Sequence, residues 1–274
     1  MDVHTARDVL GIERITRDTD AGALAQAAYD RLLELLSDLT EQEWSAPTEC
    51  APWDVAAMVG HVIGAARSGA SLREAARQQW CGSRQAGRFD GNRLDATNDV
   101  QVRDHAALTP EERIVALREV APAAVAGRLA LPRPLRRVSV PLDAGGSTAA
   151  GMPSRLQLGQ LMDVVYTRDV WLHTLDIARA TGRPYTPDAV VDARIVEDVV
   201  AEWMTRHGAP LELELTGPAG GRFRHGTGGG VLEMDAVELC RVLSGRAPVE
   251  GPGAPAMTAS PISMRRLLAT RLVF

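Results

Sequence analysis

The chain has 274 residues, of which 45% are hydrophobic and 24% charged, and its formal net charge is −5. This balance permits one large or two smaller globular domains, and the acidic charge argues against a nucleic-acid surface, which needs clustered positive charge. All 30 basic residues are arginine, which excludes a lysine Schiff base, a pyridoxal phosphate anchor and a P-loop lysine. No stretch approaches about 18 consecutive apolar residues, so we expect no membrane span.

The cysteines and the N-terminal stretch indicate the compartment. Cys50, Cys81 and Cys240 are odd in number, widely spaced and without a C-x-x-C motif. This pattern does not predict a disulfide framework and fits a reducing environment. The first residues contain neither a basic nor an apolar signal region. We therefore expect a cytoplasmic protein.

Helical periodicity dominates the first two thirds of the chain. Apolar residues at helical spacing predict four helices, at residues 19–39, from 54 to about 66, from 110 to about 129, and at 154–180. Asp54 and Thr109 are suitable N-caps, and Gly182 is a suitable C-cap. The polar segment 92–103 fits a short helix or a loop, and the proline-rich segment 131–153 fits a long irregular connection. Four helices of this length predict a bundle.

The pattern changes after Pro187. A helix is predicted at 188–207, strands at 211–215, 222–225 and 231–234 with glycine-rich turns between them, a short helix at 235–243, and a final helix at 261–268. We predict an α+β fold that is mainly α. Its expected domains are a four-helix bundle at 1–185 and a smaller α+β domain with a meander sheet at 186–274.

Asp169 and His173 are the first candidates for a functional site. Residues four apart lie on one face of a helix, so this carboxylate and imidazole can bind one metal ion. His61, in the second predicted helix, supplies a third donor. Three protein ligands with one open position are typical of a catalytic metal site. The alternative is structural: an Asp–His hydrogen bond, or a salt bridge of Asp169 to Arg168 or to a partner helix.

Other candidates have simpler interpretations. Asp176 could accept the ring N–H of a ligand histidine, or it could serve helix packing alone. Cys50 lies near a helix start, where a thiolate is favoured, although a small buried cysteine is the commoner case. The glycine run at 226–230 does not match a phosphate loop and fits a hairpin turn. Arg246 follows a predicted helix end, where a cation is favoured in any protein.

Two motifs carry a family resemblance. The segment Cys50-Ala51-Pro52-Trp53-Asp54-Val55 with His61, and the segment from Arg168 to Arg183, resemble the mycothiol-dependent maleylpyruvate isomerase family of DinB-like four-helix bundles. A similar pattern continues over 211–248, so the resemblance extends from about residue 19 to residue 274. It implies a metal-binding bundle with a small C-terminal α+β domain.

The resemblance also implies a set of site residues. His61, Asp169 and His173 match the family's metal ligands, with Zn2+ or another divalent metal expected. The isomerase has a glutamate where this chain has the shorter Asp169. Arg246 matches the family's C-terminal arginine, expected to act in catalysis by balancing a substrate carboxylate or an enolate. Asn98 and Arg103 are candidates for lining the same cleft and binding the cofactor.

The function implied is a zinc-dependent enzyme that uses mycothiol, the small thiol of actinobacteria. Its thiolate would add to a small electrophilic substrate, giving S-transfer or cis–trans isomerisation. Two alternatives remain: a metal-dependent hydrolase without a thiol cofactor, and a non-catalytic ligand-binding module. The expected partners are mycothiol and the small substrate, with no nucleic acid and no membrane. The protein would be a monomer or a homodimer, and the substrate itself is not predicted.

Overall fold

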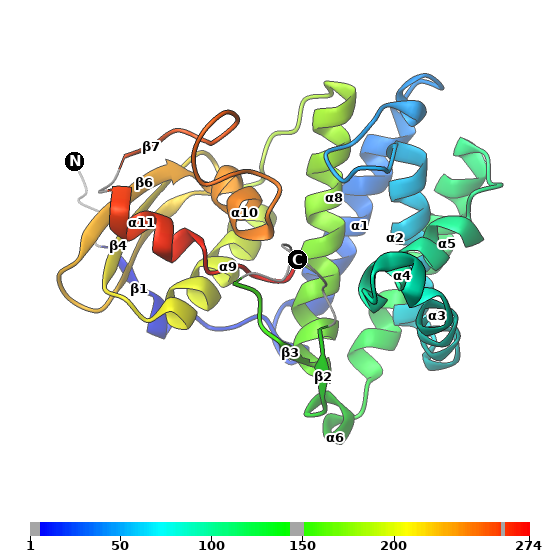
Figure 1. Ribbon diagram of the computed structural model, residues 1–274, viewed down its shortest axis with the longest axis horizontal. Helices are drawn as coiled ribbons and strands as arrows, with labels where there is room; N and C mark the ends of the chain where they lie inside the picture. Colours follow the sequence, from blue (N-terminus) through cyan, green and yellow to red (C-terminus); the bar gives the residue numbers. More distant parts are fainter. Residues whose placement is uncertain (1–5, 143–150, 259–260) are drawn as a thin grey trace. The chain divides into compact units, whose positions relative to one another are not determined.

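The computed structural model describes residues 6–142, 151–258 and 261–274, except the side chains of 261–264 (Figure 1). Within these ranges the chain forms two compact units. The bundle unit contains residues 15–142, 154–185 and 274, and the sheet unit contains residues 6–14, 151–153 and 186–273. The predicted fold class, α+β and mainly α, is confirmed. The division into two domains, at 1–185 and 186–274, remains a prediction.

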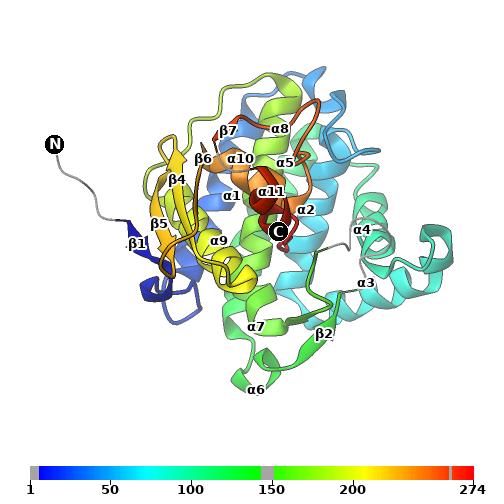
Figure 2. The same cartoon turned by 60° about the vertical axis from the view of Figure 1, so that its left-hand side comes forward.

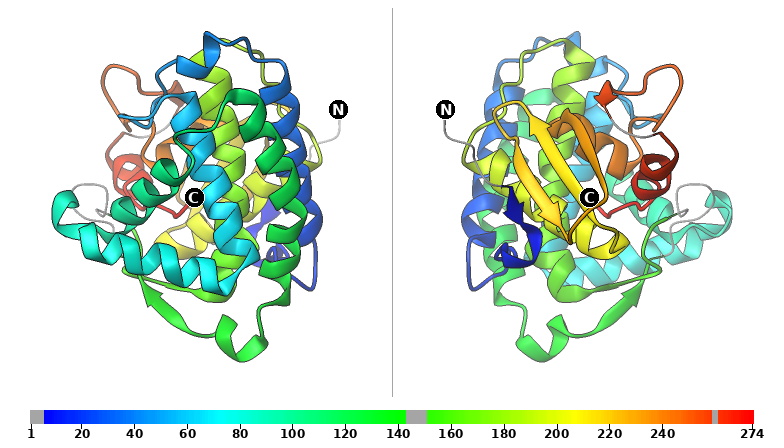
Figure 3. Two further views of the ribbon diagram at one scale, coloured as in Figure 1. Left: turned by 90° about the vertical axis from the view of Figure 1, so that its right-hand side faces the viewer. Right: turned by 90° about the vertical axis from the view of Figure 1, so that its left-hand side faces the viewer.

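Six helices of two turns or more build the bundle unit (Figure 3, left). They are α1 Ala21–Ser37, α2 Val55–Ala70, α3 Leu72–Gln85, α4 Arg93–Asp104, α5 Pro110–Ala130 and α8 Tyr166–Thr181. Helix α1 packs against α5 and α8, and α2 packs against α5, α8 and α4. The core between them includes Leu32, Leu36, Met58, Val62, Leu117, Ala121, Val170 and Ile177.

The predicted caps are present at three helix ends. The Asp54 carboxylate accepts a hydrogen bond from the Ala57 N–H, 2.7 Å away, and begins α2. Thr109 begins α5 with a reciprocal capping box. Gly182 ends α8 with a φ of 68°, the left-handed conformation that glycine adopts most readily. These local signals position the helices that carry the candidate site.

Helix α3 was not predicted. Its buried residues are only Gln78 and Gly82, so no large apolar side chain marks the face that it buries. The helix forms because Ser71 caps its first turn and because it packs against α4 and α2. Segment 92–103, left open between helix and loop, is helix α4.

The segment before α8 is less regular than predicted. Instead of one helix from 154, the chain forms strand β3 Arg155–Gln157, a short α7 Leu158–Gln160 and a π-helical turn at Leu161–Val165. Strand β3 pairs with β2 Ser139–Pro141, which follows the short helix α6 Arg133–Arg136. The predicted irregular connection therefore contains ordered elements, and its residues 143–150 lie outside the described ranges.

The described part of the sheet unit consists of a five-stranded mixed sheet, three α-helices and the short 3-10 helix η1 (Figure 2). Its elements are β1 Arg7–Asp8, η1 Val9–Gly11, α9 Val191–His207, β4 Leu211–Thr216, β5 Gly221–His225, β6 Gly230–Asp235, α10 Ala236–Ser244, β7 Met257–Thr258 and α11 Pro261–Leu268. Helix α9 packs against β5 and α10. Asp235 caps α10, because its carboxylate accepts from the N–H groups of Val237 and Glu238.

The predicted meander is wrong, because the strand order is β1-β5-β4-β6-β7 and β4 pairs with β6 in parallel (Figure 3, right). The glycine run is not a tight hairpin between neighbouring strands. It carries the chain past the start of β4, where a Cβ on Gly229 would lie 2.2 Å from the Pro210 carbonyl oxygen. Only glycine permits this approach. Turn residues indicate where a strand ends, but not which strand lies beside it.

No helix among the described residues is both long and apolar enough to cross a bilayer.

Candidate metal centre

The structure brings His61, Asp169 and His173 together in the bundle unit. The Nε2 atom of His61 lies 3.4 Å from Asp169 Oδ2, and the Nε2 atom of His173 lies 3.2 Å from Asp169 Oδ1. One donor atom from each residue lies within 4.8 Å of the others. The carboxylate therefore faces both imidazoles, one from α2 and one from its own helix α8. We call these three residues the triad.

The triad is partly enclosed by aromatic and apolar side chains. His61 and His173 are 5% and 4% exposed, whereas the Asp169 side chain is 18% exposed. The His61 ring lies 4.9 Å from the Trp53 ring and 5.2 Å from the His173 ring, centroid to centroid. The two imidazoles are thus held in place, and the carboxylate keeps a route to solvent.

The phase of each helix explains this convergence. Asp54 sets the start of α2, so that Met58 and Val62 enter the core and His61 lies on the neighbouring face. On α8, Val170 and Ile177 enter the same core. Because α2 and α8 pack together, the polar side chains beside those apolar positions meet.

Asp176 lies behind His173, as the sequence had suggested. Its Oδ2 atom is 3.0 Å from His173 Nδ1 and 3.5 Å from the Sγ atom of Cys50. Asp176 is only 1% exposed. As an acceptor it fixes a proton on Nδ1 of His173, so that Nε2 is the atom that faces Asp169 and binds either a proton or a cation. A carboxylate behind a ligand histidine commonly orients that ligand in metal sites.

The electrostatics of the triad call for a positive charge between its donors. Burial raises the pKa of the Asp169 carboxyl, but His173 and His61 outweigh burial and hold it well below its ordinary value. Burial lowers the pKa of His173, but Asp169, Asp176 and Cys50 together outweigh burial and raise it well above its ordinary value. Without a metal, a proton supplies that charge. Two imidazole nitrogens and one carboxylate oxygen are also donors that zinc accepts, so the residues present fit a divalent ion.

The other predicted site residues are not part of the triad. Arg103 is half-exposed, pairs with Asp99 at 2.7 Å and donates to Gln85. It lines an open cavity of about 390 Å3 between α3 and α4, whereas Asn98 is half-buried on α4. Arg246 is half-buried and follows α10 in the sheet unit. Their predicted roles remain predictions.

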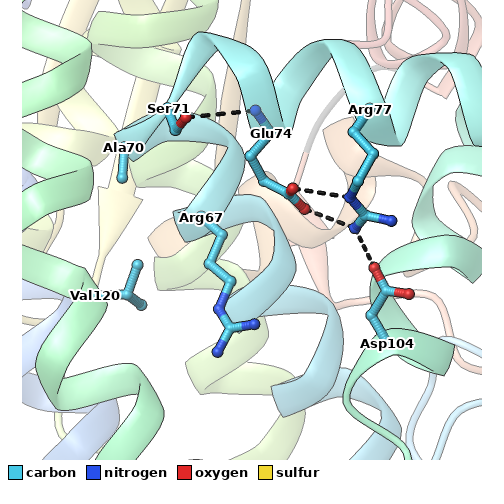
Figure 4. Close-up of a pocket in the computed structure, with 7 residues that line it drawn as sticks. All are labelled: Arg67, Ala70, Ser71, Glu74, Arg77, Asp104 and Val120. Carbon is cyan, nitrogen blue, oxygen red and sulfur yellow. Dashed lines mark hydrogen bonds and ion pairs between the residues drawn. The ribbon is translucent and has the colours of Figure 1, made fainter.

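A larger open cavity, of about 560 Å3, lies at the junction of α2 and α3 (Figure 4). It is lined by Arg67, Ala70, Ser71, Glu74, Arg77, Asp104 and Val120. Arg77 donates to both Glu74 oxygens, at 2.8 and 2.7 Å, and to Asp104. No triad residue lines this cavity, so it is distinct from the candidate metal centre.

Helices α1, α2, α5 and α8 form a four-helix bundle that carries an inward-facing carboxylate and two histidines. Residues 25–178 match the family model of the mycothiol maleylpyruvate isomerase N-terminal domain. This match covers more than half of the chain, so the chain belongs to that family.

Two solved structures are similar to the chain. They are crystal structures of the mycothiol-dependent maleylpyruvate isomerase and of a histidine-to-alanine mutant of it. Their identities to this chain are 14% and 15%, and both TM-scores are 0.53. The alignments cover 92% and 90% of this chain, and 95% and 98% of those chains. At this identity the likeness shows a shared fold. No curated protein matches the chain.

Proposed function

We propose that the protein is a metal-dependent enzyme that uses mycothiol. In this proposal the thiolate adds to a small electrophilic substrate, and the outcome is S-transfer or cis–trans isomerisation. The observation that supports it most directly is the triad, in which one carboxylate faces two imidazole nitrogens in a chain of this family. The proposed ion is zinc or another divalent metal, held by His61, Asp169 and His173.

The metal would supply one piece of chemistry: a thiol bound to it is deprotonated at neutral pH. The chain's own residues do the rest. Asp176 holds the Nδ1 proton of His173 and so keeps the Nε2 lone pair directed at the triad. Trp53 shields the face of the His61 ring. Arg246 is the proposed partner of a substrate carboxylate or a developing enolate, which suits the two-pronged guanidinium.

Metal analysis tests the site. Purified protein should contain about one divalent ion per chain, and His61→Ala and His173→Ala should each lose it. His225→Ala is a matched control, because His225 lies in the sheet unit and its ring contacts the Ala209 carbonyl oxygen at 3.3 Å. Equal metal content in all four proteins would exclude the triad as the metal site.

Thiol dependence tests the reaction. Turnover of a panel of small electrophiles should require mycothiol. It should fall when free cysteine is supplied as the thiol in place of mycothiol. Turnover that ignores added thiol would point to a hydrolase that uses a metal-bound hydroxide. A metal-free protein that binds the same small molecules without turnover would point to a non-catalytic binding module.

A further inference from the structure

Arg128, near the end of α5, is a buried cation without a hydrogen-bonding partner. The residue is 2% exposed. Its Nε, Nη1 and Nη2 atoms are all buried and make no hydrogen bond, a combination found at no other arginine among the described residues. Burial of a charge is costly unless the charge is paired and hydrogen-bonded. No described residue therefore accepts a hydrogen bond from the Arg128 guanidinium.

Two aromatic rings lie beside this cation. The Arg128 guanidinium carbon is 5.8 Å from the Tyr29 ring centroid and 5.7 Å from the Tyr166 ring centroid, on α1 and α8. Ring faces attract a cation, but they carry no net charge. The two tyrosines therefore position the guanidinium in the bundle interior and leave its N–H donors without acceptors.

The tyrosines do not become anions at neutral pH. Burial raises the pKa of Tyr29 to about 12, even though Arg128 opposes the shift. Burial, helped by the charge of Asp169, also raises the pKa of Tyr166, against a hydrogen bond from Ser68 and the charge of Arg128. Both phenols thus stay protonated, and a phenolate cannot be the missing counter-charge.

The helix crossing is built to admit the arginine. A Cβ on Gly69 of α2 would lie 3.2 Å from Arg128 Cγ, and a Cβ on Gly127 of α5 would lie 2.5 Å from the Gly69 carbonyl oxygen. Two glycines at the crossing let α2 and α5 approach closely and leave space for the arginine stem. Close packing at this helix crossing therefore holds the Arg128 side chain in its buried position.

We propose that Arg128, between Tyr29 and Tyr166, is a binding site for a small anion inside the bundle. A carboxylate group suits it best, because its two oxygens match the planar guanidinium fork. The anion comes from one of two sources: a free inorganic ion, or the carboxylate of a small organic molecule. None of its three residues belongs to the triad, although the Asp169 charge acts on both tyrosines.

Thermal unfolding of the purified full chain tests this site. Sodium formate, acetate and bromide are titrated separately, with sodium gluconate, a bulkier carboxylate, holding the ionic strength constant. A bound anion should raise the unfolding midpoint in a saturable manner, since ligands that bind only the native state stabilise it. Saturation with formate and acetate but not bromide indicates a carboxylate site, and saturation with bromide as well indicates a site for free inorganic anions.

Arg128→Met should lose the saturable response. Arg118→Met should retain it, because Arg118 is an exposed arginine on the same helix. His61→Ala should also retain it, so that failure of the metal proposal and failure of this one are told apart. If Arg128→Met does not fold, Arg128→Lys, which keeps the charge and loses the fork, should weaken the apparent formate affinity roughly tenfold. A wild-type protein without any saturable response, or an unchanged response in the Arg128 variants, would overturn the proposal.

Discussion

Two buried polar clusters in the same bundle differ in how their charges are balanced. In the triad, Asp169 contacts two imidazoles, and His173 contacts a second carboxylate on Asp176. At Arg128, the guanidinium lies near two tyrosine rings, and its nitrogens have no hydrogen-bond partner among the described residues. The first cluster presents acceptors around a position suited to a cation, and the second presents donors around a position suited to an anion. Burial alone therefore does not identify a site; the balance between donors and acceptors does.

Removal of the shared carboxylate should have the largest effect. Asp169→Asn leaves two imidazoles facing an uncharged amide, so we expect loss of bound metal and a fall in turnover of at least about 100-fold. Asp169→Glu, which restores the carboxylate with one more methylene, should keep both. The checks are metal content by elemental analysis and turnover with mycothiol. Stoichiometric metal in Asp169→Asn would show that the two histidines hold the ion without the carboxylate.

Loss of the carboxylate behind His173 should have a smaller effect. Asp176→Asn keeps the size of the side chain but weakens its hold on the His173 Nδ1 proton, and we expect metal affinity to fall about 10- to 100-fold. Asp163→Asn is a matched control, because Asp163 is a buried carboxylate paired with Arg136. The control should lower the unfolding midpoint and leave metal affinity unchanged, as measured by competition with a chelating dye. Equal affinity losses in the two variants would indicate a general stability effect.

The sheet unit contains a half-buried histidine, His207, that is kept neutral. Burial, helped by His225, lowers the pKa of His207 to about 4. His207 Nδ1 accepts the Ala209 N–H at 3.0 Å, and protonation of that atom breaks the bond. The unfolded chain takes up this proton near pH 6.5 and the folded chain only near pH 4, so stability falls as the pH drops through this window.

The expected loss of unfolding free energy is on the order of 1 to 2 kcal/mol, reduced from the full shift because the ring is partly exposed. Denaturant unfolding of wild type and His207→Gln between pH 7 and pH 4 measures it. The variant should show a shallower fall, and parallel curves would assign the acid sensitivity to other groups.

Local signals made some of these features predictable from the sequence and left others hidden. Asp54, Thr109 and Gly182 are capping residues at short range, and the helices they delimit were predicted. The convergence of His61 with the α8 pair followed from helical periodicity and from the family resemblance. The parallel pairing of β4 with β6 depends on how a loop passes Pro210, which no spacing of turn residues reveals. Arg128 gave no signal either, because an arginine in an amphipathic helix is normally exposed.

The smallest expected effect on metal affinity concerns Cys50, which contacts the carboxylate behind His173. Cys50 Sγ lies 3.5 Å from the Asp176 oxygen that also contacts His173. As a weak donor, the thiol helps to fix this carboxylate, so Cys50→Ala should weaken metal affinity about threefold to tenfold, the effect of one hydrogen bond. Cys50→Ser, which restores a donor, should recover most of the loss. If Ser and Ala weaken affinity equally, the thiol acts by packing alone, and the orientation of His173 depends on Asp176 without help from Cys50.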